Sequence, residues 1–290
     1  MILSVVVITH NEEANLGRTL ASVQPLVADG KGEIMVVDSG STDCTVEIAK
    51  SYGAKVFVEE WKGYAAQKNS AIDKASGDWI LSLDADEEVE PDLATELARH
   101  EVITDINPAE RSDNWCLTME QASAGSQNLD RIKGLPAGYW VPRKNYFLGR
   151  WIKHGGFWPD PKLRLFRRGM ARFEDRPVHE DAHLIEGTSG QLKGCLLHHS
   201  YPTLTDYLDH MNRYSSLGAE MVAAKGPVRF SAFNIVVRPA ATFIYNYFFR
   251  LGFLDGREGL LLHLYHAAYV SWKYAKSWEL SRVRRSTPLS

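Results

Sequence analysis

The sequence predicts an α/β fold with a mostly parallel sheet, followed by an α-helical extension. Three observations lead to this prediction. The N-terminal third alternates short apolar runs with segments of helical spacing. Polar, acidic stretches follow three of those apolar runs. From Pro202 onward, apolar residues recur at helical intervals. A chain of 290 residues with ordinary composition has room for one large domain and an appendage.

Short, β-branched apolar runs are the expected strands, and the segments between them repeat apolar residues every three or four positions, as helices do. The strands are expected at Ser4–Thr9, Ile34–Asp38, Lys55–Glu59 and Trp79–Asp84, and the helices at Glu12–Val23, Thr42–Tyr52 and Ala65–Ala75. The first apolar run lacks the basic start and the cleavage site of a signal peptide. The three cysteines are too far apart to suggest disulfides or a metal site, which favours a reducing, cytoplasmic setting.

The C-terminal part of the chain is predicted to be helical. Gly226-Pro227 marks the end of its first helix. The apolar stripe of that helix comprises Leu204, Tyr207, Leu208, Met211, Ser215, Gly218 and Met221.

Two carboxylates stand at the end of the fourth expected strand, in Leu83-Asp84-Ala85-Asp86-Glu87. Because side chains alternate along a strand, Asp84 and Asp86 are expected to project to the same side. Mg²⁺ and Mn²⁺ are typically held by one or two carboxylates together with substrate phosphates. The pair therefore indicates a divalent metal bound with a diphosphate, although such triplets also occur in solvated turns.

Polar residues also follow the second expected strand, in Asp38-Ser39-Gly40-Ser41-Thr42-Asp43. Gly40 permits a tight turn, and Thr42 or Asp43 can cap the next helix. Asp38 stands at the strand tip, where its carboxylate can accept a hydrogen bond from a base. A capped turn alone explains every residue of this stretch except Asp38.

The first expected strand ends at Thr9-His10-Asn11-Glu12-Glu13. Asn11 is interpreted as a helix N-cap with acidic residues in the first turn, which capping alone can explain. In parallel α/β sheets, ligands bind beyond the carboxyl ends of the strands. We therefore expect all three polar tips to line one site.

The three runs Ser4–Glu12, Val36–Asp43 and Leu81–Glu87 together resemble the family 2 glycosyltransferases, in that family's order and spacing. The resemblance implies a GT-A fold with a Rossmann-like nucleotide-binding half, and transfer with inversion at the anomeric carbon. It implies that Thr9 and Glu12 line a uridine pocket and that Asp38 reads the base.

The same resemblance places Lys68 near the nucleotide, although Lys68 could equally be a surface charge on its helix. It places both Asp84 and Asp86 beside the diphosphate and the metal, Mg²⁺ or Mn²⁺. We also count Asn11 among the substrate-binding residues.

A narrower resemblance connects later segments to lipopolysaccharide-core glucosyltransferases that add glucose to an inner-core heptose. In that branch the general base corresponds to Glu180. Asp181 is an alternative that resembles the base of other family members, and Glu180 can instead pair with Arg176 or Arg172. The segments are Gln67-Lys68-Asn69, Arg164-Leu165-Phe166, Val178-His179-Glu180 and His198-His199-Ser200-Tyr201, which related branches with other acceptors share.

Two further groups are candidate ligand contacts. His198 or His179 can supply an additional metal ligand, although a lone histidine is more often a hydrogen-bonded core residue. A cation–aromatic cluster can hold an acceptor phosphate while its tryptophan stacks on sugar, or it can be the solvated edge of a turn. The cluster comprises Arg164, Arg167, Arg168, Lys162 and Trp158.

The tail from Arg229 onward carries nine Lys/Arg and three Asp/Glu, although the whole chain has a net charge of −3. Its two apolar, aromatic stretches, Phe230–Phe249 and Gly259–Trp278, are interrupted by polar residues, which disfavours a membrane-spanning helix. A pair of helices lying on an anionic membrane surface is the preferred interpretation, and a dimer interface is the alternative.

The sequence therefore predicts a metal-dependent hexosyltransferase that moves glucose from UDP-glucose to a lipopolysaccharide core or related glycolipid, at the cytoplasmic face of the inner membrane. The alternatives are a polyprenyl-phosphate glycosyltransferase and a non-catalytic sugar-nucleotide or glycan-binding protein. A nucleic-acid partner is not expected. The catalytic domain is expected over residues 1–200, with a nucleotide-sugar half at 1–110 and an acceptor-facing half at 111–200, and the helical extension over 201–290.

Overall fold

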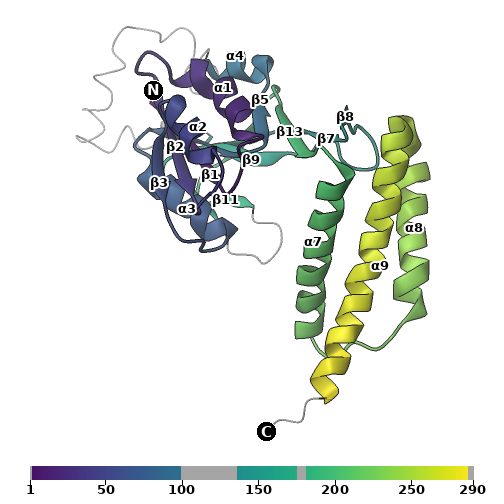
Figure 1. The fold of residues 1–290 in the computed structure, drawn as a ribbon. Helices are drawn as coiled ribbons and strands as arrows, with labels where there is room; N and C mark the ends of the chain where they lie inside the picture. Colours follow the sequence, from purple (N-terminus) through teal and green to yellow (C-terminus); the bar gives the residue numbers. More distant parts are fainter. Residues whose placement is uncertain (1, 99–135, 175–180, 287–290) are drawn as a thin grey trace. The chain divides into compact units, whose positions relative to one another are not determined.

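The computed structural model describes residues 2–98, 136–174 and 181–286 (Figure 1). These residues form two compact units. The first contains the described residues of 1–142, 161–175 and 181–196, and the second contains 143–160 and 197–286. This division differs from the expected boundary after residue 200, because segment 143–160 packs with the C-terminal helices.

A seven-stranded sheet forms the centre of the first unit, in the order β12-β6-β9-β4-β1-β2-β3. Its strands are β1 (Leu3–Thr9), β2 (Gly32–Asp38), β3 (Lys55–Val58), β4 (Trp79–Asp84), β6 (Gly138–Val141), β9 (Lys162–Arg167) and β12 (Ser189–Gln191). The pairs β1–β2, β1–β4, β2–β3 and β6–β12 are parallel, whereas β9 is antiparallel to both β4 and β6. The predicted α/β class with a mostly parallel sheet is confirmed.

Helices cover both faces of this sheet (Figure 1), which explains why its central strands are apolar on both sides. Val5 and Val7 of β1 face one core, which also contains residues of α1 (Leu16–Val27), α2 (Thr45–Ser51) and α4 (Pro91–Ala98). Val6 faces the other core, with α3 (Tyr64–Lys74). The short strand β5 (Glu87–Val89) follows β4, and β10 (Ala171–Phe173) pairs with β11 (Ala182–Leu184).

The prediction that Asn11 caps the first helix is wrong. Helix α1 begins at Leu16, four residues later than the predicted start at Glu12. Asn11 adopts a left-handed backbone with φ of 56°, and the carbonyl of Glu12 accepts hydrogen bonds from the amides of Asn15 and Leu16 in the turn before the helix. The loop after β1 is therefore longer than expected, and Asn11 is available for contacts with another loop.

The second unit consists of a small sheet region and a group of helices. Strands β7 (Arg143–Phe147), β8 (Arg150–Trp151) and β13 (Leu196–Tyr201) precede α7 (Leu204–Ala224). A capping box of Thr203 and Asp206 starts α7. The long helix α9 (Gly256–Ser286) packs against α7, and Tyr207 and Leu262 belong to their shared core.

Between α7 and α9 lie η2 (Phe233–Val237), α8 (Arg238–Ile244), η3 (Tyr245–Phe249) and η4 (Gly252–Asp255), of which η2 and η3 are π-helical and η4 is a 3₁₀ helix. Asp255 is buried and fixes the segment after β8 to these helices: it accepts hydrogen bonds from the amide of His154 at 2.8 Å and from the amide of Lys153 at 3.2 Å. None of the described helices combines the length and apolar content needed to cross a membrane.

Candidate active site

The ends of three neighbouring parallel strands bring the predicted polar tips of the first unit together. In the register of the sheet, Thr9 lies opposite Asp38, and Ile8 lies opposite both Val37 and Asp84. Thr9, Asp38 and Asp84 therefore stand within one residue of the same level, at the carboxyl edge where α/β sheets bind ligands.

Asp38 organises the loop after β2. One carboxylate oxygen accepts hydrogen bonds from the Thr9 hydroxyl at 2.8 Å and from the Ser41 hydroxyl at 2.5 Å. The other accepts from the backbone amides of Gly40 and Ser41 at 2.9 and 2.8 Å. Burial raises the pKa of Asp38, but these hydrogen bonds outweigh it and hold the pKa below its ordinary value. These hydrogen bonds account for the position of Asp38 without a ligand. Its contact with a nucleotide base stays a prediction.

Asn11 connects the loops after β1 and β2. The side-chain oxygen of Asn11 accepts a hydrogen bond from the backbone amide of Thr42 at 2.8 Å, and the backbone amide of Asn11 donates to the Ser41 hydroxyl at 2.8 Å. Glu12 is held in the same way, because its amide donates to the Thr45 hydroxyl at 2.7 Å. These hydrogen bonds join the loops after β1 and β2. A ligand that contacts one loop therefore lies next to the other.

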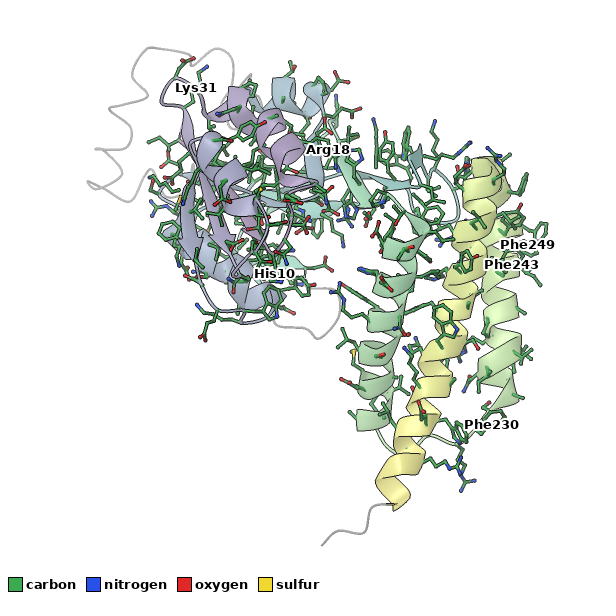
Figure 2. All side chains as sticks on the ribbon, viewed as in Figure 1. His10, Arg18, Lys31, Phe230, Phe243 and Phe249 are labelled. Carbon is green, nitrogen blue, oxygen red and sulfur yellow. The ribbon has the colours of Figure 1, made fainter. Side chains whose placement is uncertain are left out.

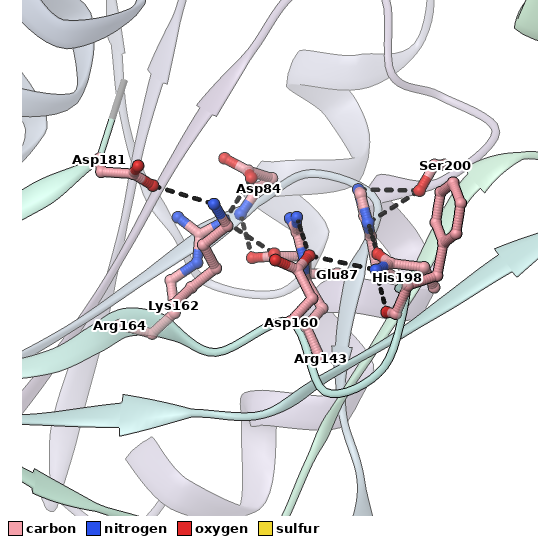
Figure 3. A network of polar contacts seen from close by, with 11 residues as sticks. Asp84, Glu87, Arg143, Asp160, Lys162, Arg164, Asp181, His198 and Ser200 are labelled. Carbon is pink, nitrogen blue, oxygen red and sulfur yellow. Dashed lines mark hydrogen bonds and ion pairs between the residues drawn. The ribbon is translucent and has the colours of Figure 1, made fainter. Parts of the chain in front are cut away.

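A buried charge network surrounds Asp84 (Figure 3). The Lys68 ammonium of α3 lies 2.7 Å from one carboxylate oxygen of Asp84, and the Arg164 guanidinium of β9 donates to the other. Arg164 also contacts Glu87 at 2.7 Å, and the second oxygen of Glu87 accepts from the Asp84 amide at 3.0 Å. Lys68 is buried, so the alternative that it is a surface charge is wrong.

Arg164 and Glu87 depend on each other because both are buried. Burial lowers the pKa of Arg164, but the charges of Asp84 and Glu87 outweigh it and raise that pKa further above its ordinary value. An unpaired carboxylate in this position would carry a large desolvation cost. The described contacts of Arg164 are with these two acids, and its predicted contact with an acceptor phosphate stays a prediction.

Glu12 and Asp86 form the acidic part of the site. Burial raises the pKa of Glu12, and the charges of Asp86, Asp43 and Asp84 raise it further, despite a hydrogen bond from Asn15. Ala85 and Asp86 form the turn between β4 and β5, so the strand alternation invoked for Asp86 ends at Asp84. A bound cation would relieve the repulsion among these carboxylates, so this donor set fits Mg²⁺ or Mn²⁺.

Within the described residues, no three His, Cys, Asp or Glu side chains are grouped so that they could hold a metal ion by themselves. Such a group is not required, because substrate phosphates supply part of the shell of these ions. His198 belongs to the second unit, where its Nδ1 lies 2.6 Å from the Asn145 side-chain oxygen and 2.7 Å from the Ser200 hydroxyl. Its role as a metal ligand stays a prediction.

Of the two candidate bases, Glu180 lies outside the described residues, as does His179. Asp181 precedes β11 and accepts a hydrogen bond from Lys162 at 2.9 Å (Figure 3). The role of general base stays a prediction for both residues.

The predicted cation–aromatic cluster around Arg164 is not formed as one group. Residues of β9 alternate across the sheet, so Arg164 turns toward Asp84 while Arg167 lies over the Trp79 ring at 5.2 Å. Arg168 donates to the carbonyl of Gly77. Trp158 belongs to the second unit and contacts the Trp151 ring, with 5.3 Å between the ring centroids.

Sequence reasoning assigned no role to Glu87, although it is a buried member of the charge network. In the sequence, nothing distinguishes Glu87 from its acidic neighbours in the run Asp84-Ala85-Asp86-Glu87. The available signal was charge balance: if Lys68 and Arg164 are both placed at this edge, two carboxylates are needed to compensate them.

A sequence model described as glycosyl transferase family 2 matches residues 4–171. An uncharacterised glycosyltransferase of Rickettsia typhi is 30% identical, over 98% of this chain and 89% of its own. The lipopolysaccharide core biosynthesis glycosyltransferase LpsC of Rhizobium meliloti is 28% identical, over 96% of this chain and 92% of its own. Glucosyl-3-phosphoglycerate synthase from Mycobacterium tuberculosis, solved with Mn²⁺, UDP and glucosyl-3-phosphoglycerate, matches 29% of this chain and 33% of its own, at 33% identity and a TM-score of 0.27.

The Arg164→Met substitution should destabilise the chain by about 3–5 kcal/mol, because it leaves Glu87 buried without its cation. The double variant Arg164→Met/Glu87→Met should recover most of that loss. Urea unfolding measures both. Arg18→Met is the control, since Arg18 belongs to a more exposed pair with Glu88 and should cost about 1 kcal/mol or less. A double variant no more stable than Arg164→Met would contradict the pairing.

The Glu12→Gln substitution should raise the melting temperature at neutral pH in the presence of a chelator. Because the pKa of Glu12 is raised in the folded chain, its ionised form costs stability above its ordinary pKa of 4.5, and that cost disappears as the pH falls below this value. The difference from wild type should therefore shrink in acid. Glu60→Gln, at an exposed position, should show no such trend. Mn²⁺ should stabilise wild type more than Glu12→Gln, and equal stabilisation would argue against a cation at this carboxylate.

Proposed function

The chain belongs to glycosyltransferase family 2, and we propose that it transfers glucose from UDP-glucose to a lipopolysaccharide core or a related glycolipid. The family membership rests on the match over residues 4–171. The observation that carries the proposal is the joint placement of Thr9, Asp38 and Asp84 at one sheet edge, beside an acidic group of Glu12 and Asp86. Such an edge suits a nucleotide diphosphate bound with a cation.

The acceptor assignment has separate support. The relative LpsC, whose name assigns it to lipopolysaccharide core biosynthesis, is similar over 96% of this chain and not only over the nucleotide-binding part. The preference for UDP and glucose follows from the sequence resemblance. We propose that the reaction takes place at the cytoplasmic face of the inner membrane, where a growing glycolipid meets soluble nucleotide sugars.

In the proposed reaction, an acceptor hydroxyl oxygen attacks the anomeric carbon of the donor. The bond from that carbon to the diphosphate oxygen breaks, and the hydroxyl proton passes to a carboxylate of the protein, Glu180. Asp86, with Glu12 and Asp84 nearby, would hold Mg²⁺ or Mn²⁺, which stabilises the charge on the leaving diphosphate when it is bound. Lys68 and Arg164 keep Asp84 in place during the reaction.

The proposed metal site predicts that Asp86→Asn lowers turnover of UDP-glucose by about 100-fold or more, because leaving-group stabilisation is lost. UDP release with deacylated core oligosaccharide as acceptor measures it. Asp92→Asn, at an exposed position on α4, is the control and should keep full activity. Turnover with undecaprenyl phosphate instead of core oligosaccharide would identify a polyprenyl-phosphate transferase. No UDP release with any acceptor would favour a non-catalytic binding protein.

The choice of base predicts a difference between neighbouring variants. Glu180→Gln should lower turnover by about 10²–10⁴-fold, whereas Asp181→Asn should keep most of it. Both variants should bind UDP-glucose as wild type does, measured by thermal stabilisation with the donor. If Asp181→Asn is the inactive variant and Glu180→Gln retains activity, the base is Asp181.

A further inference from the structure

The helical run of η2, α8 and η3 exposes many of its apolar residues. Apart from Arg238, its exposed positions recur at helical spacing and form one apolar stripe: Phe233, Val236, Val237, Ala240, Ala241, Ile244, Tyr245, Phe248 and Phe249. The polar residues Asn234, Thr242 and Asn246 are half-buried instead. A surface helix of a water-soluble bundle normally has the opposite arrangement, with its apolar stripe toward the core.

The exposed apolar surface extends beyond this run in both directions. Phe230 precedes it, and Figure 2 shows Phe230 and Phe249 at opposite ends of the run. Exposed apolar side chains also follow just before η4, within it and in the first turns of α9, namely Leu251, Phe253, Leu254, Leu260 and Leu264. We call the stripe together with these residues the apolar face. Exposed apolar surfaces of this extent mark sites of interaction.

The charges in the segment that carries the stripe have one sign. Residues 228–254 contain Arg229, Arg238 and Arg250 and no aspartate or glutamate. All three arginines are exposed. Arg238 donates to the Tyr274 hydroxyl and lies 5.0 Å from the centre of its ring, so its charge is held beside the stripe. The partner of this face must therefore combine an apolar interior with negative charge.

A hollow with basic and aromatic side chains lies at the Phe230 end of the apolar face. The Phe230 and Trp278 rings meet edge to face, with 5.4 Å between their centroids. Arg282 lies 5.8 Å from the centre of the Trp278 ring. Tryptophan beside arginine is the combination found where a protein meets lipid headgroups. The hollow is lined by Val228, Arg229, Phe230, Trp278, Ser281 and Arg282.

We propose that the apolar face lies in the headgroup region of an anionic lipid bilayer, with Arg229, Arg238 and Arg250 beside lipid phosphates. A second copy of the chain fits less well. Two such faces related by a two-fold axis would bring arginines together, with no acidic residue from 228–254 to compensate them. A bilayer supplies both acyl chains for the stripe and phosphates for the guanidinium groups. The inference depends on the helical unit alone and not on which sugar is transferred.

Sedimentation of the full chain with lipid vesicles tests this proposal. The chain should bind phosphatidylcholine vesicles that contain phosphatidylglycerol, and should bind pure phosphatidylcholine much less. Each Arg→Gln substitution at 229, 238 and 250 should lower the partition coefficient for anionic vesicles about fivefold. Added salt should weaken binding of wild type more than that of the triple Arg→Gln variant.

The apolar contribution is tested by Val236→Ser/Phe249→Ser, which removes side chains that are 63% and 74% exposed and should leave the melting temperature unchanged. It should lower vesicle binding about tenfold or more. The control is Ile185→Ser in the first unit, where Ile185 is also 63% exposed. Vesicle binding that this double variant leaves unchanged would overturn the proposal. So would a dimer in lipid-free solution that the double variant dissociates, detected by sedimentation equilibrium.

Discussion

The buried cations Lys68 and Arg164 pair with Asp84 at the active-site edge, and Arg164 also makes the burial of Glu87 possible. These residues come from β4, β5, α3 and β9, so the charge pairing fixes elements that are distant in sequence. A carboxylate without its cation would be costly at this depth, and a cation without its carboxylate equally so. The network therefore holds the end of β4 in one place, beside the tips of β1 and β2. Every function proposed for this edge depends on that placement.

The charge balance also separates two kinds of carboxylate in the site. Asp38 is satisfied by four hydrogen bonds from its own turn and from Thr9, and Asp84 is satisfied by two cations. Glu12 is different, because burial raises its pKa and neighbouring carboxylates raise it further. The first group holds the strand ends and their loops in place, whereas the acidic pair of Glu12 and Asp86 favours a cationic ligand. The repulsion between this acidic pair and a diphosphate is a physical reason to expect a cation in the proposed reaction.

The second unit combines an ordinary apolar core with a helical run whose apolar stripe is exposed. Tyr207 and Leu262 form an ordinary apolar core, and Asp255 is buried because it accepts hydrogen bonds from the segment after β8. The run from Phe233 to Phe249 instead has Asn234, Thr242 and Asn246 half-buried and exposes an apolar stripe. Burying that stripe within the chain would have given stability, so its exposure is best explained by an external partner. Chemistry in the first unit and attachment through the second would together suit an acceptor that is part of a membrane.

The sequence by itself determined the α/β class, most of the N-terminal elements and the three strand ends that carry Thr9, Asp38 and Asp84, because hydrophobic periodicity is a local property of the chain. It misplaced the start of α1, because the left-handed turn at Asn11 is stabilised by a loop some thirty residues away, at Ser41 and Thr42. Only the tertiary structure decided that Lys68 and Arg164 are buried partners of Asp84 and Glu87, and that Arg164 separates from Arg167. Such pairings depend on which strands become neighbours and which side each residue faces. β9 lies beside β4 across about eighty residues of chain, and no local pattern specifies that contact.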